Sequence, residues 1–438
     1  MDIVSIEPRM LKGTVTVPPS KSVAHRAIIC AALSGGACCI SNVALSRDIE
    51  ATLRCMRALG AAFRTSAGKM QVTFSPGRKK TRLKELILDC GESGSTLRFL
   101  MPIALLAGRP VRLTGQGRLL QRPQKPYFEL FGKKGIRCEE GPDSICLSGS
   151  LEPGVFRLPG DVSSQFITGL LFALPLLGGD SEIQVTTPME SKGYVDLTLA
   201  VLRDFGIAVK NESYRRFVIP GRQTYGPRDY RIEGDYSQAA FFLVAGALGC
   251  DVRCAGLGSE SLQGDKKVLE ILREAGAGIQ TFPDGAVRAV RTDRMCGLTI
   301  DAREIPDLVP VLAVLCAFLK GESRIVNAGR LRMKESDRLA AVTSELKHLG
   351  LDITEGADHL RIVGTDVLYG TTVSAWNDHR IAMALAVAAC RCEGEVSITG
   401  AAEAVTKSYP DFFDVYRKLQ TGPTPLLGFG QMITEECI

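Results

Sequence analysis

The feature that most constrains the fold is a segment that recurs six times along the chain. Each copy is an apolar helix-forming run that ends at a glycine and precedes a short strand-forming run, as in "KSVAHRAIICAALSGGACCISNV" and "NDHRIAMALAVAACRCEGEVSITG". The closing glycines lie 70 to 73 residues apart, at Gly36, Gly108, Gly178, Gly249, Gly321 and Gly394. Such regular spacing indicates a repeat architecture in which each copy is one folding unit.

Each unit continues with a second helix-forming run, for example "ATLRCMRALGAAF" and "RLAAVTSELKHLGLDI". The glycine near the end of each run stands where a helix C-cap favours left-handed backbone. The unit is therefore predicted as helix, strand, helix, strand, strand. Its first helix is apolar nearly all round and is expected at the centre of a domain, whereas the amphipathic second helix is expected outside.

The ends of the chain indicate how the units are grouped. The sixth copy stops after "DFFDVYRKL", and the strand that it lacks can come from the N-terminal "DIVSIEP". Segments marked by proline or glycine at about 17–20 and 224–230 are predicted as a double hinge. We therefore expect an α/β (α+β) protein with two domains of three units each: an upper domain of residues 20–228, and a discontinuous lower domain of residues 1–19 and 229–438.

Composition excludes several classes of protein. The 438 residues are 45% hydrophobic with a net charge of +5, and the densest basic run, "GRKKTRLK" at 77–84, is interpreted as a solvated loop rather than a nucleic-acid arm. Fourteen cysteines without paired C-x-x-C spacing favour free thiols in a reducing cytoplasm over a zinc site. The apolar stretches at 165–177 and 308–319 are too short to span a membrane.

Polar residues gather where the apolar helices are expected to begin. The N-terminal end of a helix exposes unpaired N–H groups that carry partial positive charge. If the two domains face each other with these ends inward, their cleft attracts anions. The residues at the six ends are Lys21, Ser22 and Arg26; Gly94, Ser95 and Arg98; Ser163, Ser164 and Gln165; Asp235, Ser237 and Gln238; Asp307; and Asn377, Asp378, His379 and Arg380.

Charged residues in the connecting segments add to this pattern. Arginine suits bidentate binding of phosphate or carboxylate, and lysine can hold a charge or carry a proton. An Asp or Glu among cations is not suited to anion binding, which favours general acid or base chemistry, although Glu335 could instead pair with Arg338 one turn on. These residues are Arg122, Lys192, Lys334, Arg338, Lys407 and the acids Asp307 and Glu335.

Nine motifs together resemble one known family. They are "PPSKSVAHR", "GESGSTLRF", "RPQKP", "DVSSQFITGLL", "ESKGYVDLT", "IPDLVPVLA", "RMKESDRL", "NDHRIAMALA" and "TKSYPDFF". In this order, from about residue 8 to 415, they resemble the 5-enolpyruvylshikimate-3-phosphate synthase family. The resemblance implies a two-domain inside-out α/β barrel of six βαβαββ units that closes over its substrates.

The resemblance also implies a reaction. The enolpyruvyl group of phosphoenolpyruvate is transferred to the 5-hydroxyl of shikimate 3-phosphate with release of phosphate, by addition and elimination through a tetrahedral intermediate. This step belongs to the shikimate pathway to chorismate and the aromatic amino acids. The resemblance implies no metal or organic cofactor, no nucleic-acid or membrane partner, a cytoplasmic monomer and a target of glyphosate.

Carried over motif by motif, the resemblance implies site residues. Shikimate 3-phosphate is expected at Ser22, Arg26, Ser163, Ser164, Gln165, Ser191, Tyr194, Asp307 and Lys334. Phosphoenolpyruvate is expected at Lys21, Gly94, Arg122, Gln165, Arg338, Arg380 and Lys407. Asp307 is implied to take the proton of the attacking hydroxyl, and Lys21 and Glu335 to protonate the methylene carbon or the departing phosphate.

Three positions depart from the common pattern of the family. Glu92 and Arg330 stand where many members have Asn, and Phe99 replaces a common Pro. Gly94 keeps the small residue that glyphosate needs, so the sequence leaves sensitivity to this inhibitor open. The tail from residue 421 to 438 has no counterpart in the repeat.

Two other functions compete with this interpretation. The sister enolpyruvyl transferase of UDP-N-acetylglucosamine typically carries a catalytic Cys on a loop that here reads "GQGRLLQRPQKP", without Cys. A non-catalytic phosphate-binding or RNA-end-binding module has no use for an acid and a base, so Asp307 and Lys21 argue against it.

Overall fold

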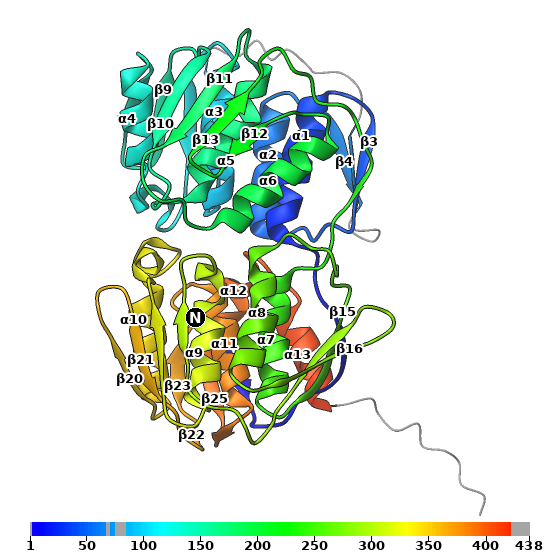
Figure 1. The fold of residues 1–438 in the computed structure, drawn as a ribbon, viewed down its shortest axis with the longest axis vertical. Helices are drawn as coiled ribbons and strands as arrows, with labels where there is room; N and C mark the ends of the chain where they lie inside the picture. Colours follow the sequence, from blue (N-terminus) through cyan, green and yellow to red (C-terminus); the bar gives the residue numbers. More distant parts are fainter. Residues whose placement is uncertain (1, 67–70, 75–84, 422–438) are drawn as a thin grey trace, which may run out of the picture.

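The computed structural model describes residues 2–66, 71–74 and 85–421, and the described chain forms two stacked halves (Figure 1). Each half has its own hydrophobic core. The core of the upper half runs from Val23 to Ile232, and that of the lower half combines Val4–Val17 with Tyr236–Leu419. The basic run at 77–84 and nearly all of the tail at 421–438 lie outside the described residues. None of the described helices is long and apolar enough to cross a membrane.

The upper half contains three units in sequence. In chain order its elements are α1 (Lys21–Ser34), β3 (Cys38–Ser41), α2 (Arg47–Ala58), β4 (Phe63–Ser66), β5 (Gln71–Phe74), β6 (Leu86–Asp89), α3 (Gly94–Leu105), β7 (Val111–Thr114), η2 (Leu119–Gln121), α4 (Lys125–Lys133), β8 (Arg137–Glu140), β9 (Ser144–Ser148), β10 (Gly154–Leu158), α5 (Ser164–Ala173), η3 (Leu174–Leu176), β11 (Ser181–Val185), α6 (Lys192–Asp204), β12 (Lys210–Glu212), β13 (Arg216–Ile219) and β14 (Tyr230–Arg231).

The lower half contains the other three units and both ends of the described chain. Its elements are β1 (Ile3–Ile6), β2 (Lys12–Thr16), α7 (Tyr236–Ala247), β15 (Asp251–Ala255), η4 (Gly264–Lys267), α8 (Val268–Glu274), β16 (Gly278–Thr281), β17 (Val287–Val290), β18 (Thr299–Asp301), η5 (Pro306–Leu308), α9 (Val309–Ala317), β19 (Glu322–Val326), η6 (Gly329–Met333), α10 (Arg338–His348), β20 (Asp352–Glu355), β21 (Leu360–Val363), β22 (Leu368–Tyr369), β23 (Thr372–Ser374), α11 (His379–Ala389), β24 (Cys392–Glu393), β25 (Val396–Thr399), α12 (Ala401–Val405) and α13 (Phe412–Thr421).

The predicted unit is confirmed. In the second unit β6 pairs in parallel with β7, and the hairpin β8–β9 adds to β7 antiparallel; the third and fifth units repeat this order. Every residue of α7, α9 and α11 is buried, whereas α2 buries only one face. Apolar helices therefore fill each half and the sheets lie outside, as an inside-out α/β fold requires.

Glycine ends the second helices as expected. The residues that follow these helices have left-handed backbone at Gly60, Gly135, Gly206, Gly276 and Gly350. For the first helices the pattern is less regular, because α1 ends at left-handed Gly35 rather than at Gly36, and Gly178 has no positive φ.

The two crossings between the halves exchange strands. β2 precedes α1 in the chain but pairs with β15 of the lower half, and β14 precedes α7 but pairs with β3 of the upper half. The crossing segments bond to each other, since Ser20 N donates to Glu233 O at 2.7 Å and Asp235 N to Pro18 O at 2.9 Å. At the other end β1 pairs antiparallel with β25, so the predicted use of the N-terminal strand by the sixth unit is confirmed. The domain bounds 20–228 and 229–438 stay a prediction.

Candidate active site

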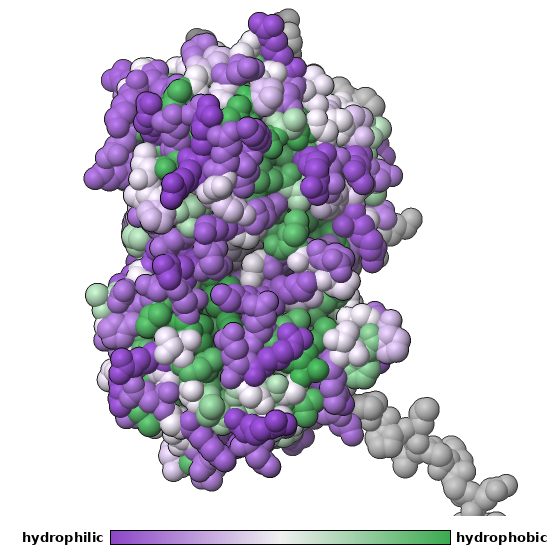
Figure 2. Space-filling model, in the orientation of Figure 1, coloured by the Kyte–Doolittle hydropathy of each residue, from purple (hydrophilic) through white to green (hydrophobic). Residues whose placement is uncertain are grey.

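A cleft between the halves receives the N-terminal ends of all six central helices. Its lining includes the first residues of α1, α3, α5, α7, η5 with α9, and α11. Hydrophilic residues cover much of the seam between the halves on the face in Figure 2. The predicted site residues that line this cleft are Lys21, Ser22, Arg26, Gly94, Arg122, Ser163, Ser164, Gln165, Ser191, Tyr194, Asp307, Lys334, Glu335 and Arg380.

Side chains just before these helices hold their first turns in place. Ser20, Ser93 and Ser163 each accept a hydrogen bond from a backbone N–H of the following turn. Asp235 and Asp378 do the same for α7 and α11. Such caps satisfy part of the unpaired N–H groups, and the remaining partial positive charge favours a nearby anion by about 0.3 to 1 kcal/mol for each helix.

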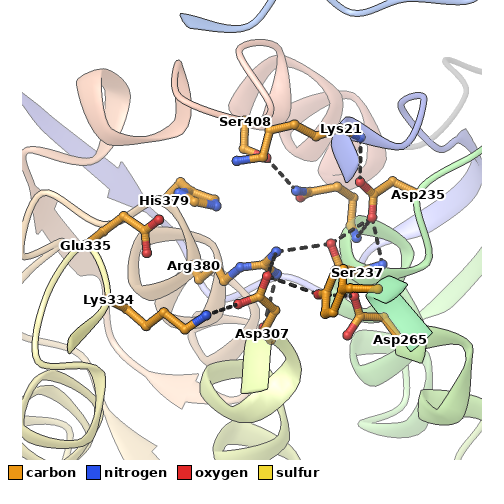
Figure 3. A network of polar contacts seen from close by, with 12 residues as sticks. Lys21, Asp235, Ser237, Asp265, Asp307, Lys334, Glu335, His379, Arg380 and Ser408 are labelled. Atoms are coloured by element: carbon orange, nitrogen blue, oxygen red, sulfur yellow. Dashed lines mark hydrogen bonds and ion pairs between the residues drawn. The ribbon is translucent and has the colours of Figure 1, made fainter. Parts of the chain in front are cut away.

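Asp235 also joins the two halves. Its Oδ1 accepts from Ser237 N at 2.8 Å within α7, and its Oδ2 accepts from Lys21 N at 3.0 Å at the start of α1 (Figure 3). One carboxylate thus fixes the starts of two central helices beside the crossing segments.

Arg26 and Arg98 of the upper wall are buried, and neither forms an ion pair with a carboxylate of the described residues. Arg26 donates to Thr198 Oγ1, Ser22 O and Tyr194 O, and burial lowers its pKa to about 10. Arg98 donates to Gln165 Oε1 at 2.7 Å, and burial, followed by the charge of Arg122, lowers its pKa to about 9. This wall is short of negative charge.

Arg122 lies directly over the start of α3. A Cβ at Gly94 would approach the Arg122 guanidinium to 2.7–2.9 Å, so the absence of a side chain there makes room for the arginine. Arg122 Nε has no hydrogen-bond partner among the described residues, and Nη1 lies 3.7 Å from Glu335 Oε1 of the lower half.

Lys21 is the ammonium at the tip of α1. Its Nζ lies 2.8 Å from Asp48 Oδ2, and both side chains remain partly exposed to the cleft, at 18% and 14%. The charged end of Lys21 is therefore anchored on one side and accessible on the other.

Asp307 is surrounded by cations in the lower wall. It lies 3.0 Å from Arg338 Nη1. It also lies 3.0 Å from Arg380 Nη2 and 3.7 Å from Lys334 Nζ (Figure 3). Burial alone would raise the pKa of Asp307, but Arg380, Lys334 and Arg338 together hold it well below its ordinary value. The carboxylate is ionised and able to accept a proton.

Glu335 is held in the same way. Burial opposes ionisation, yet Arg338, at 2.7 Å from Oε2, and Arg122 hold the pKa of Glu335 well below its ordinary value. The pKa of Lys334 is also lowered, to about 8, but here burial is the cause and the attraction of Asp307 opposes it.

Tyr194 connects the upper half to two acids of the lower half. Its hydroxyl lies 3.0 Å from Asp265 Oδ2 and 3.3 Å from Asp307 Oδ2. Burial, followed by the charge of Asp307, raises the pKa of Asp265 to about 7. Together with the Arg122–Glu335 contact, these bonds show that the halves meet around the cleft.

Two of the residues that the resemblance assigned to the substrates lie outside the cleft lining. Arg338 is buried behind the lower wall, where Nε donates to Asp378 Oδ2 at 2.8 Å, and from there it reaches Asp307 and Glu335. Lys407 is also buried, and its Nζ donates to Glu92 Oε2 and Asn377 O, both at 2.7 Å. Arg330, which like Glu92 departs from the common pattern of the family, donates to Ser191 Oγ at 3.1 Å.

Several residues near the reacting groups were not among those that the resemblance assigned to substrate binding or catalysis. Arg98 and Asp48 line the cleft, and Asp265 contacts Tyr194. His379 is fully buried beside Glu335, and neither ring nitrogen has a hydrogen-bond partner among the described residues (Figure 3). Arg98 and His379 occupy helix ends in the repeat, so that position was the available signal, whereas nothing in the sequence marks Asp48 or Asp265.

Sequence comparisons agree with one another. The family described as EPSP synthase (3-phosphoshikimate 1-carboxyvinyltransferase) matches residues 6–416. A protein of Clostridium kluyveri named 3-phosphoshikimate 1-carboxyvinyltransferase is 47% identical over 421 residues, which cover 96% of this chain and 97% of that protein. One of the same name from Clostridioides difficile is 46% identical over 430 residues, covering 96% and 98%.

Solved structures resemble the whole fold. EPSP synthase from Acinetobacter baumannii superposes with a TM-score of 0.78 at 26% identity and covers 95% of this chain and 98% of that one. The enolpyruvyl transferase NikO from Streptomyces tendae, at 19% identity, shares the fold with a TM-score of 0.76, covering 95% and 97%.

A six-unit inside-out fold whose central helices begin at one cation-rich cleft defines an enolpyruvyl transferase fold. The sequence match over residues 6–416 identifies one family within this class. The chain belongs to the EPSP synthase family, and it is an enzyme of the 3-phosphoshikimate 1-carboxyvinyltransferase type.

Proposed function

We propose that this cleft transfers the enolpyruvyl group of phosphoenolpyruvate to the 5-hydroxyl of shikimate 3-phosphate, with release of phosphate. The observation that carries the proposal is the ionised Asp307, which lies among Arg380, Arg338 and Lys334 and faces the ends of the central helices. A cleft that only bound anions would gain nothing from such a carboxylate, whereas a transfer between two anions needs a base beside cations.

In this proposal the upper half supplies most of the groups for both reactants, and the lower half completes each set. The hydroxyls and amides of the upper wall suit a sugar-like ring and its phosphate: Ser22, Arg26, Ser163, Ser164, Gln165, Ser191 and Tyr194, with Lys334 and Asp307 opposite. Phosphoenolpyruvate is assigned to Lys21, Gly94, Arg122, Gln165 and Arg380, supported from behind by Arg338 and Lys407.

The first chemical step joins the two substrates. The 5-hydroxyl oxygen forms a bond to carbon 2 of phosphoenolpyruvate while its proton passes to Asp307. The methylene carbon takes a proton from Lys21, since Glu335 is ionised beside Arg338 and Arg122 and has none to give. The product is a tetrahedral intermediate that carries both phosphate groups.

The second step releases phosphate. The bond between carbon 2 and the phosphate oxygen breaks, and the phosphate leaves with the electron pair and the proton held by Asp307. The methyl group loses a proton to Glu335, which restores the vinyl group, and transfer of that proton from Glu335 to Lys21 resets the site. Fixing both reactants in one cleft can supply about 7 to 11 kcal/mol of barrier lowering in well-oriented cases.

Opening and closing at the two crossing segments is part of the proposal. The halves touch through Tyr194, Arg122 and Asp235, so substrates need these contacts to loosen before they enter. Closure then removes water and strengthens every charge interaction in the cleft.

The same proposal covers the setting in which the enzyme works. One chain supplies both walls of the cleft, which supports a monomer, and all thirteen described cysteines are free, which supports a reducing cytoplasm. No metal or organic cofactor is assigned to the reaction. Glyphosate is proposed to occupy the phosphoenolpyruvate site beside Gly94.

Phosphate release tests the proposal directly. The purified protein is given phosphoenolpyruvate with shikimate 3-phosphate or with UDP-N-acetylglucosamine, and phosphate and the enolpyruvyl product are measured. We expect turnover with the first acceptor only. Turnover with the second acceptor, or a folded protein that binds phosphate without turnover, would overturn it.

A further inference from the structure

Glu92 places a negative charge beside a cation assigned to substrate. It stands two residues before α3 in the upper half, and its Oε2 lies 2.7 Å from Nζ of Lys407 in the lower half. Asn377 Nδ2 lies 3.4 Å from the same carboxylate oxygen. A carboxylate of the chain thus neutralises Lys407, and neither residue is among those that line the cleft.

Among the described residues, Lys407 forms no ion pair other than the one with Glu92. The Lys407 side chain is 4% exposed, and its one further contact among the described residues is the neutral Asn377 O. The Glu92 side chain remains 27% exposed, and a Cβ at Gly117 would lie 2.8 Å from its Oε2. Glu92 therefore lies between Lys407 and the loop that leads to Arg122.

We propose that Glu92 lowers the affinity of the site for phosphoenolpyruvate by competing with its phosphate group for Lys407. The inference rests on the proposed function, in which Lys407 supports that substrate. The buried ammonium is neutralised in the free enzyme, and the substrate has to displace a carboxylate tethered in the same chain before it gains this charge. Removing the carboxylate leaves a buried cation unpaired, which favours an external anion.

Glu92→Gln tests this competition because it removes the charge and keeps the shape. We expect the KM for phosphoenolpyruvate and the inhibition constant of inorganic phosphate to fall by about tenfold, while the KM for shikimate 3-phosphate changes less than twofold. Glu92→Asp, which keeps the charge, should stay within threefold of wild type. An unchanged or raised KM for phosphoenolpyruvate in Glu92→Gln would overturn the proposal.

Glu403→Gln is the matched control. Glu403 forms an exposed ion pair across the same two halves, 3.3 Å from Arg47, without lining the cleft. Its removal should leave both KM values unchanged. A fall equal to that of Glu92→Gln would mean that looser closure, and not competition for Lys407, controls the affinity.

A double variant tests whether Lys407 is the residue for which Glu92 and phosphoenolpyruvate compete. Lys407→Met and Glu92→Gln/Lys407→Met should share one KM for phosphoenolpyruvate, and a further fall in the double variant would refute the competition. If Glu92→Gln fails to fold, Glu92→Asn replaces it. Titration of inorganic phosphate into the folded variants needs no turnover, so it tests this inference independently of the proposed reaction. Equal phosphate affinity in wild type and Glu92→Gln would refute the inference and leave the proposed reaction untouched.

Discussion

The two walls of the cleft are built from the same repeat but carry different side chains. In the upper wall the described lining is rich in hydroxyls and cations, and Asp48 is its one carboxylate. The lower wall contributes Asp235, Asp307 and Glu335 together with Arg330, Lys334 and Arg380. Helices that begin at the cleft are common to both walls, so the difference lies in the side chains at the helix ends and in the neighbouring segments.

This difference changes how the arginines behave. Burial lowers the pKa of Arg26 and Arg98 in the upper wall, where carboxylate partners are lacking. In the lower wall burial has the same tendency, but Asp378, Glu335 and Asp307 raise the pKa of Arg338, and Asp307 raises that of Arg380. The upper wall therefore gains most from a substrate anion, whereas the lower wall already has its charges paired and suits proton transfer.

Asp307→Asn should have the largest effect, because it removes the proton acceptor of the lower wall and leaves the binding groups of the upper wall unchanged. The amide keeps the shape but cannot accept the hydroxyl proton, so we expect kcat to fall by about 10³- to 10⁴-fold with binding of shikimate 3-phosphate largely kept. Rapid-mixing kinetics and calorimetry measure the two quantities. Asp301→Asn, at an exposed carboxylate near the start of the same segment, should be silent. Near-normal turnover of Asp307→Asn would remove this residue from the proton-transfer scheme.

Lys21→Met tests the proton donor in the otherwise binding wall. The side chain lies in the cleft rather than the core, so activity should fall by about 10²- to 10³-fold while the melting temperature stays close to wild type. Lys12→Met, on the exposed part of β2, serves as the control. Unfolding of the Lys21 variant would mean that the residue is structural.

Gly94→Ala probes the upper wall alone. Its methyl group would displace the Arg122 guanidinium, which lies 2.7–2.9 Å away from that position, so the KM for phosphoenolpyruvate should rise by about tenfold with little change for shikimate 3-phosphate. Gly178→Ala is matched, because a Cβ there meets nothing within 4 Å and the backbone needs no positive φ. Equal effects of the two substitutions would contradict the placement of Arg122.

Lys334 is expected to have the smallest effect on activity, and this effect depends on pH. Its pKa is lowered to about 8, so as pH rises through this value the ammonium loses its proton and its attraction for an anion. We expect kcat/KM for shikimate 3-phosphate to decline by a few-fold above about pH 8, because this ratio reports groups of the free enzyme. Lys334→Arg should move the decline to higher pH, and an unmoved profile would assign it to another group.

Sequence patterns predicted the parts of this molecule that are local. Each central helix is a continuous apolar run with a polar start, so the six helix ends and their residues followed from the repeat. The pairing of β2 with β15 and of β14 with β3 did not follow from the repeat. Alternation of polar and apolar residues within a strand does not indicate which sheet the strand joins.

Side-chain partners were harder to predict. Arg338 and Lys407 were expected in the cleft, yet both are buried, and their partners Asp378 and Glu92 are 40 and 315 residues away in the chain. Asp265 becomes important only because folding places it under Tyr194. Contacts of this kind form only when distant segments fold together, so they leave no spacing in the sequence.

The central claim is that the upper wall supplies most of the groups that bind the anions, while Asp307 of the lower wall takes the proton of the attacking hydroxyl. A crystal structure with shikimate 3-phosphate and an unreactive analogue of phosphoenolpyruvate tests it most directly. We predict the shikimate phosphate at Ser22, Ser163 and Ser164, and the 5-hydroxyl about 3 Å from Asp307. A 5-hydroxyl directed away from Asp307, or substrates bound outside this cleft, would contradict the account.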